Sequence, residues 1–299
     1  MPWAGSFVLE MKEYIIFTDE SSITDSRFHC LSAFSFEKSS YNFVNDSLKT
    51  LLLESKVEEF KWNKLKDAKY FFCAEKIIRF VLNNISKINL RIDTLVWDTH
   101  DKRHKVQRRD DLANYERMFF HLLHNSLKKR SKDSRWSIHP DKRGGINWQV
   151  VHDCLHHKGK MTEFENLIFG SFLTDPHYSI ADFQERHSHE EISIQIPDLF
   201  SGLSVFSRTN YDRFKKHRES KIPSLFEKKE PDILSNRESF RFQLLDLFNK
   251  ECKNRKIGVS LDTNGYLYTF KPENPLNFWH YEPQGDYDRA PQKNQREEK

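Results

Sequence analysis

The chain of 299 residues is too long for one small domain and short for three, so we expect one elaborated domain or two domains. Its 48 basic and 44 acidic side chains give a net charge of +4, a mild excess that permits nucleic-acid binding without requiring it. Only 9 glycines are present, which argues against a barrel of tight hairpins and against a glycine-rich nucleotide-binding loop.

Cysteine usage and hydropathy indicate the compartment. The four cysteines are far apart in the sequence and have neither zinc-knuckle nor redox-motif spacing, which suits a reducing compartment. No signal peptide is evident, and no apolar run approaches the ~20 residues of a membrane span. We therefore expect a cytoplasmic protein with no membrane association, whose 25 Phe residues help to build a sizeable core.

The first half of the chain alternates between strand and helix patterns. Strands are expected over 13–18, 28–36, 57–65 and 90–96. Helices are expected over 42–53, 66–84 and 111–129. A turn-like stretch separates the first two strands, so we predict that they form a hairpin.

The second half is less regular. Strands are expected over 135–139 and within 188–196, and a hairpin over 258–270. Helices are expected over 147–157, 197–207 and 239–252. We interpret the highly charged segment 208–235 as a linker or irregular excursion. The pattern predicts an N-terminal extension (1–11), a mixed α/β domain (12–208), a smaller C-terminal appendage of helix and hairpin (209–283) and a disordered tail (284–299).

Acidic residues stand at element ends in four places. "YIIFTDESS" brings Asp19 and Glu20 to the end of the first strand, where a carboxylate can be held rigidly enough to bind a hard cation. Asp and Ser are also ordinary loop residues, and the local sequence alone favours that simpler interpretation. "EEFKWNKL" places Glu59 and Lys61 on one face of an extended segment; it equally describes an edge strand with a solvated charged face.

Two further aspartates have the same ambiguity. Asp141 in "IHPDKRGG" is followed by Lys142 and Arg143, which suits either a metal–phosphate site or an ordinary turn. Asp198 in "ISIQIPDLFSG" enters an apolar helix, as a buried ligand or as a charge favoured by the helix dipole. Asp98 and Asp101 also follow a strand and are rivals to Asp141.

Pairs of histidines provide a weaker zinc hypothesis. His152 and His156 are four residues apart, and His121 and His124 are three apart, so each pair can share one helix face. A zinc site needs at least one more protein ligand, and most such pairs are surface or packing residues.

Taken in order, the four acidic motifs resemble the segments of a widespread bacterial family, domain of unknown function 3800. The resemblance covers roughly residues 12–208 and implies a ribonuclease-H-like fold. Ser22 stands where that family commonly has glycine, and Pro197 stands where a small residue usually precedes the last aspartate. Neither departure removes a carboxylate.

The resemblance implies a nuclease that hydrolyses phosphodiester bonds of RNA or DNA, in phage defence or a mobile element. Its implied catalytic and metal-binding residues are Asp19, Glu59, Asp141 and Asp198, with Glu20 as an adjacent candidate. Mg²⁺ or Mn²⁺ would be the cofactor, and the implied phosphate-binding residues are Lys61, Lys142 and Arg143.

The alternative is a non-catalytic ribonuclease-H-like scaffold, since fold alone does not fix function. The aromatic-rich "NFWHYEP" would then be a docking surface for a protein partner, or else core aromatics that cover the main sheet, which we favour. Strand alternation further predicts that the Glu20 side chain points away from that of Asp19. Convergence of the four acids on one place would favour the enzyme, whereas a basic side chain filling their centre would favour the scaffold.

Overall fold

The computed structural model of the protein describes residues 11–21, 27–101, 111–131, 133–169, 178–220 and 234–282. The expected tail at 284–299 and all but residue 11 of the expected N-terminal extension lie outside these ranges. So do Ser22 and the centre of the predicted linker, 221–233.

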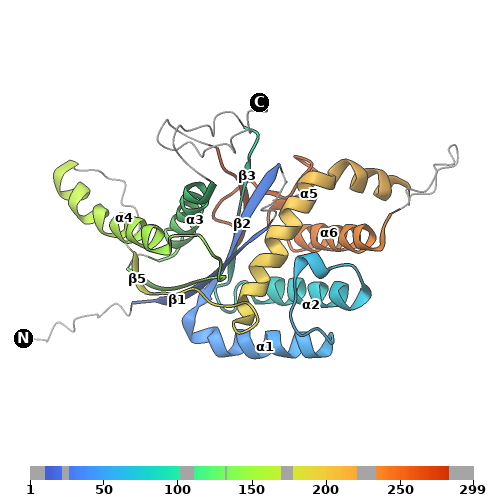
Figure 1. Ribbon diagram of the computed structural model, residues 1–299, viewed down its shortest axis with the longest axis horizontal. Helices are drawn as coiled ribbons and strands as arrows, with labels where there is room; N and C mark the ends of the chain where they lie inside the picture. Colours follow the sequence, from blue (N-terminus) through green and yellow to red (C-terminus); the bar gives the residue numbers. More distant parts are fainter. Residues whose placement is uncertain are drawn as a thin grey trace, which may run out of the picture.

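Six strands form one mixed sheet in the order β5-β4-β1-β2-β3-β8 (Figure 1). They are β1 (Glu13–Ser21), β2 (Phe28–Glu37), β3 (Arg91–Asp98), β4 (Ser134–Pro140), β5 (Tyr178–Phe183) and β8 (Leu276–His280). β1, β2 and β3 are successively antiparallel, whereas β4 runs parallel to β1, β5 to β4, and β8 to β3. The predicted α/β class and the opening hairpin are confirmed, and the arrangement is consistent with a ribonuclease-H-like fold.

Helices cover both faces of this sheet (Figure 1). They are α1 (Tyr41–Glu54), α2 (Ala68–Asn84), α3 (Asp111–Leu127), α4 (Trp148–Phe169), α5 (Gln195–Ser220) and α6 (Asn236–Asn254). Ile15 and Phe17 of β1 pack with buried residues of α1, α2, α5 and α6. Tyr14 and Ile16 pack with α3 and α4 on the opposite face. Because side chains alternate along a strand, Asp19 continues the first row of β1 side chains.

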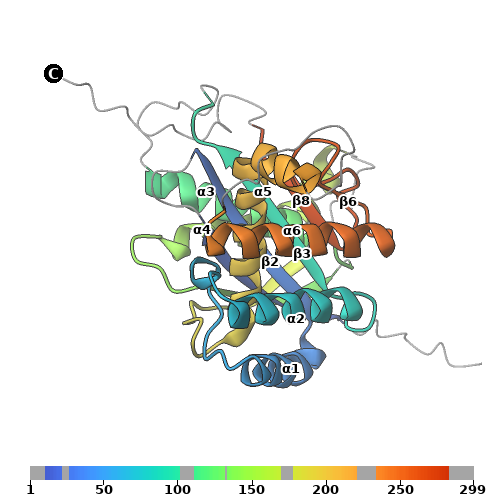
Figure 2. The same ribbon diagram turned by 90° about the vertical axis from the view of Figure 1, so that its right-hand side faces the viewer.

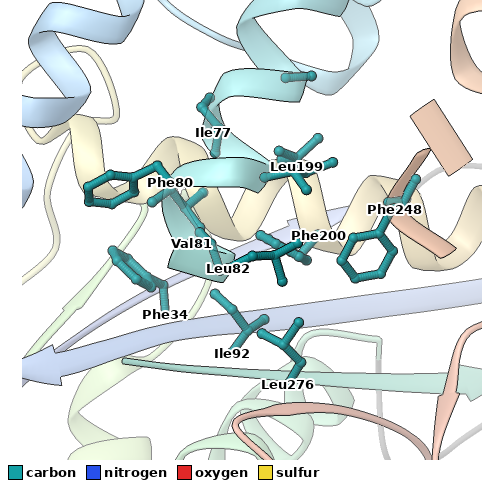
Figure 3. Packing of buried hydrophobic residues seen from close by; sticks show 14 of the residues in the cluster. Phe34, Ile77, Phe80, Val81, Leu82, Ile92, Leu199, Phe200, Phe248 and Leu276 are labelled. Atoms are coloured by element: carbon teal, nitrogen blue, oxygen red, sulfur yellow. The ribbon is translucent and has the colours of Figure 1, made fainter. Parts of the chain in front are cut away.

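The C-terminal segment packs against the rest of the protein. Figure 2 shows α6 beside α2 in front of the sheet, and the two helices are in contact. In Figure 3, Phe248 of α6 and Leu276 of β8 lie in the same cluster as Leu199 of α5 and Ile92 of β3. The predicted boundary at residue 208 falls within α5, and one hydrophobic cluster includes residues from both sides of it.

The aromatic stretch near the C-terminus belongs largely to this packing. Phe278 of β8 is completely buried, and Tyr281 is buried directly after the strand. The backbone N–H of Tyr281 donates to the carbonyl of Val96 in β3. These residues therefore cover and extend the main sheet, as we favoured from the sequence.

Two predicted strands are wrong. Segment 57–65 is irregular and ends in the 3₁₀ turn η2 (Trp62–Lys64), and 188–196 contains the 3₁₀ turn η4 (Ile192–Ile194) followed by the start of α5. Both segments alternate in polarity because their apolar side chains join the hydrophobic cluster between the sheet and its covering helices, not because they pair in a sheet. The real fifth strand, β5, was missed.

Other differences concern lengths. α5 continues to Ser220, so the predicted linker begins as helix, and α4 extends beyond the predicted end at 157. The predicted hairpin at 258–270 is present as the antiparallel pair β6 (Val259–Ser260) and β7 (Tyr268–Thr269), with a connection longer than a tight Asn-Gly turn. Within the described ranges, no helix combines the length and apolar character that crossing a bilayer requires.

Candidate functional site

The site is built around the end of β1, a central strand of the sheet. Asp19 is buried on the face covered by α5, one residue before Glu20. Thr18 pairs with Pro140 of the parallel neighbour β4, and the backbone N–H of Asp141 donates to the carbonyl of Thr18 at 2.9 Å. Two adjacent strands therefore deliver Asp19 and Asp141 to the same end of the sheet.

Asp198 reaches this place from the first turn of α5. Its neighbours Ile196 and Leu199 are completely buried and fix the helix against the sheet. Asp198 is 9% exposed, and its carboxylate accepts a 2.7 Å hydrogen bond from the backbone N–H of Trp62. Pro197 occupies the first turn of α5, where a missing N–H costs nothing.

Glu59 and Lys61 come from the irregular segment before η2. The backbone N–H groups of Phe60 and Trp62 donate to side chains of α5, the first to Gln195 Oε1 at 2.8 Å and the second to Asp198. Helix side chains thus replace the strand partner that the sequence pattern suggested. Phe60 and Trp62 are buried in the core, so Glu59 and Lys61 point the other way, toward Ser188 and Asp141, as the alternation predicts.

Ser188 connects three of these residues, and the sequence analysis missed it. Its hydroxyl donates to Glu59 Oε1 at 2.8 Å and accepts from Lys61 Nζ at 2.8 Å. Its backbone N–H donates to Asp141 Oδ1 at 3.1 Å, and its carbonyl accepts from the side chain of Gln195. A serine in a histidine-rich polar loop has no local signature, so only the three-dimensional arrangement identifies this role.

The Lys61 ammonium lies among the acids. Its Nζ is 3.7 Å from a Glu59 oxygen and 3.8 Å from an Asp141 oxygen. Burial lowers the pKa of Lys61, but the negative charges of Asp19, Asp198, Asp141 and Glu59 outweigh burial and raise it. Lys61 is therefore a charged lysine surrounded by four carboxylates.

One lysine does not balance that charge. Burial raises the pKa of Asp19 well above its usual value, and the charges of Asp198, Glu20 and Asp141 raise it further. Burial likewise raises the pKa of Asp198 to about 6, although the Trp62 N–H and Lys61 oppose the shift. The pKa of Asp141 is also raised, chiefly by burial. Mutual repulsion of carboxylates at one place is the state that bound cations relieve.

Glu20 belongs to the edge of this cluster. Burial raises its pKa to about 7, with Asp141 and Asp198 contributing, while the Arg143 guanidinium 3.2 Å away opposes the shift. Arg143 also lies over the ring of Tyr115 in α3, 4.4 Å from its centroid. Glu20 thus points to the α3 face of the sheet and Asp19 to the α5 face, in agreement with strand alternation.

The three basic residues predicted to bind phosphate differ in how close they lie to the acidic residues. Lys61 is central, and Arg143 is engaged with Glu20 and Tyr115. The Lys142 side chain is exposed, and its backbone N–H donates to the carbonyl of Arg186. Lys64, which was not predicted, lies 3.8 Å from Glu59.

The rival candidates have partners of their own. Asp98 accepts a two-pronged hydrogen bond from Arg27, and although burial raises its pKa, Arg27 and the backbone N–H of His100 lower it below the usual value. A site that lowers the pKa of its aspartate already supplies the compensating charge. Asp101 contributes to none of the contacts of the acidic cluster described above.

The histidine pairs find other partners. The rings of His152 and His156 stack 5.9 Å apart, while His121 and His124 hydrogen-bond to Tyr281 and Tyr178, respectively. Neither pair gains the third ligand of a zinc site, because the described ranges contain no group of three or more His, Cys, Asp or Glu side chains set to hold a metal ion.

We define the acidic cluster as Asp19, Glu20, Glu59, Asp141 and Asp198. Among the described residues, its carboxylates are likewise not arranged as a group set to hold a metal ion. Its donor chemistry fits Mg²⁺ or Mn²⁺, which prefer carboxylate oxygens. As they stand, its carboxylates contact Lys61, Ser188 and Trp62. A cation would therefore compete with the Lys61 ammonium for the same oxygens.

The fold and the site together define an α/β protein with a buried acidic cluster at one end of its mixed sheet. Comparison with known proteins adds two relatives from Methanothermobacter thermautotrophicus. Uncharacterized protein ORF2' is 35% identical over 298 residues, covering 94% of this chain and 98% of that protein. Uncharacterized protein ORF2 is 34% identical over 288 residues, covering 91% and 95%.

The chain belongs to the family of these two proteins, because the similarity extends over nearly the whole length of each. No protein-family model matches the sequence. The resemblance to domain of unknown function 3800 therefore stays a prediction based on the four acidic motifs.

Proposed function

We propose that this protein is a metal-dependent nuclease that hydrolyses phosphodiester bonds of RNA or DNA at the acidic cluster. One observation carries the proposal: carboxylates from four segments far apart in sequence come close enough to raise one another's pKa. Burying several like charges together is costly, and such unbalanced sites are where function concentrates. The four motifs that bring them there resemble those of the ribonuclease-H-like family named from the sequence, which supports the proposal.

In this proposal, Asp19, Glu59, Asp141 and Asp198 hold Mg²⁺ or Mn²⁺, with Glu20 beside them. The bound ions would activate a water and stabilise the leaving oxygen of a phosphodiester. Lys61, Lys142 and Arg143 contribute positive charge toward the phosphate. Lys61 has a second task, since it neutralises part of the cluster before an ion binds.

The test is cleavage of RNA, DNA and hybrid substrates with Mg²⁺ or Mn²⁺. We expect activity that a chelator removes, and a loss of about 100-fold or more in the Asp19→Asn and Asp198→Asn variants. Asp212→Asn is a matched control, because Asp212 lies exposed on the same helix as Asp198. A wild-type protein that neither binds divalent ions nor cuts any of these substrates contradicts the proposal.

A non-catalytic scaffold is the second candidate, and the position of Lys61 favours it. An ammonium group among the carboxylates is the arrangement expected where charge pairing has replaced ion binding. The two candidates differ in the response of the Lys61→Met variant. In a nuclease, removing Lys61 strengthens divalent-ion binding measured by calorimetry; in a scaffold, the variant loses stability and still binds no ion. A role in phage defence or a mobile element is implied by the resemblance alone.

A further inference from the structure

Trp62 is the residue through which the C-terminal helix α6 contacts the acidic cluster. Its backbone N–H donates to Asp198, and its backbone carbonyl accepts a 3.0 Å hydrogen bond from Arg241 of α6. Trp62 thus links Asp198 to Arg241, a residue 179 positions after Trp62 in the chain.

The Trp62 indole contacts both α5 and α6. Beneath it lies Gly202, where an added Cβ would come within 2.2 Å of the ring, so only glycine allows the indole to lie this close to α5. On the Arg241 side, the guanidinium lies 4.6 Å from the ring centroid of Trp62 and 5.7 Å from that of Phe206. An arginine over an aromatic ring is attracted by the ring quadrupole, and more strongly when both are desolvated.

Among the residues that the structure describes, no carboxylate forms an ion pair with Arg241. Burial lowers its pKa to about 10, while the negative charge of Asp198 opposes that shift. Its Nε is buried without a hydrogen-bond partner, and its guanidinium donates to a backbone carbonyl. A buried arginine in these surroundings is a costly residue, which calls for a role beyond packing.

We propose that Arg241 is a positioning residue for the acidic cluster: by clamping Trp62 against Gly202, it fixes the segment that carries Glu59 and Lys61 and the backbone donor that orients Asp198. The use of the cluster as a nuclease site rests on the proposed function above, whereas the positioning does not. The C-terminal part of the chain is then required for the geometry of a site whose acidic residues all precede it.

The first measurement is hydrogen exchange of the Trp62 amide, whose N–H is bonded to Asp198. In Arg241→Met, which removes the guanidinium and keeps an apolar stem, we expect exchange about 10-fold faster than in the wild type. Arg237→Met is the matched control, because Arg237 is exposed one turn earlier on α6; it should leave exchange unchanged. Unchanged Trp62 exchange in a folded Arg241→Met protein overturns the inference.

Arg241→Lys is a second variant in case Arg241→Met does not fold. Lysine retains the charge but not the planar group that stacks on Trp62 and reaches its carbonyl. We expect the exchange rate of Arg241→Lys to lie between those of the wild type and Arg241→Met. If Arg241→Lys exchanges at the wild-type rate, a positive charge alone is sufficient, and the proposed role of the guanidinium in holding Trp62 is overturned.

Calorimetric binding of Mn²⁺ then separates the two proposals. If the wild type binds Mn²⁺, affinity should fall about 10-fold in Arg241→Met and stay unchanged in Arg237→Met. If the wild type binds no Mn²⁺ but Trp62 exchange still accelerates in Arg241→Met, the nuclease proposal fails and the positioning role stands.

Discussion

Two buried aspartates in this protein, each in a group of charged residues, have pKa values shifted in opposite directions. Asp93 of β3 is completely buried, and although burial raises its pKa, Arg91 and Lys129 lower it far below the usual value. Arg91 binds Asp93 with Nε–Oδ2 at 2.7 Å, and Asn277 of β8 adds a further hydrogen bond. Asp19 is buried nearly as deeply, yet its pKa is raised.

The two aspartates differ in how their charges are compensated, which separates a structural charge from a candidate functional one. Around Asp93, the chain supplies more positive than negative charge, and the sheet edge formed by β3 and β8 is held together by it. Around Asp19, carboxylates outnumber the nearby cations Lys61 and Arg143, so the folded protein tolerates repulsion there. Structural groups are selected to be balanced; an unbalanced group needs a ligand or partner to explain it.

The largest effect should come from removing the balanced acid. Asp93→Asn keeps the shape of the side chain but leaves the buried Arg91 and the half-buried Lys129 without their counterion, so we expect a loss of about 3–5 kcal/mol in the free energy of unfolding. Denaturant titration measures it. The exposed Asp212→Asn should change stability by less than about 0.5 kcal/mol. A similar small change in Asp93→Asn would remove the contrast between the two groups.

A smaller effect is expected in the pH dependence of the free energy of unfolding, measured on protein free of divalent ions. Raised pKa values of about 7 for Glu20 and about 6 for Asp198 mean that the folded state binds more protons than the unfolded state. Their contribution to stability is complete below about pH 4 and is lost as pH rises toward 7. Asp93, with its lowered pKa, has the opposite sign: its contribution is present above its unfolded pKa and is lost as pH falls.

Urea titrations between pH 4 and pH 7 test this sign. We expect the Asp198→Asn variant to gain about 2 kcal/mol relative to the wild type over that range, because Asn cannot ionise. Asp212→Asn should follow the wild-type curve. If the free energy of unfolding changed equally with pH in Asp198→Asn and the wild type, the pKa of Asp198 would not be raised in the folded protein.

Backbone donors and packing hold the acidic cluster in addition to its charge pairs with Lys61 and Arg143, and Gly202 tests the contribution of packing. In Gly202→Ala, the new Cβ would overlap the Trp62 ring, so the segment must shift; we expect a loss of about 2 kcal/mol. The same substitution at Gly144, where nothing lies within 4 Å, is the control and should cost far less. Differential scanning calorimetry and hydrogen exchange of Trp62 report the two consequences.

The sequence predicted the acids of the cluster better than it predicted what holds them. Asp19 and Asp198 stand at a strand end and a helix start, where patterns are strong, and their order along the chain resembles that of the family motifs on which the prediction was based. Ser188 and Gln195 bridge segments more than 100 residues apart, and such long-range hydrogen bonds leave no local pattern. The alternation in 57–62 correctly placed Glu59 and Lys61 on one side, although the partner is a helix and not a strand.

The smallest expected effect is also the most diagnostic. Asp19→Asn keeps the size of the side chain but removes an acid whose ionisation is opposed by burial and by neighbouring carboxylates, so the variant should be more stable than the wild type by about 1 kcal/mol at pH 7 without divalent ions. Together with the loss at Asp93, this gain would mark Asp19 as an acid kept at a cost to stability. Adding Mg²⁺ or Mn²⁺ should raise the stability of the wild type relative to Asp19→Asn, since bound ions stabilise only the folded protein that holds them. A variant less stable than the wild type in the absence of ions would instead make Asp19 a structural acid like Asp93, and would favour the scaffold over the nuclease.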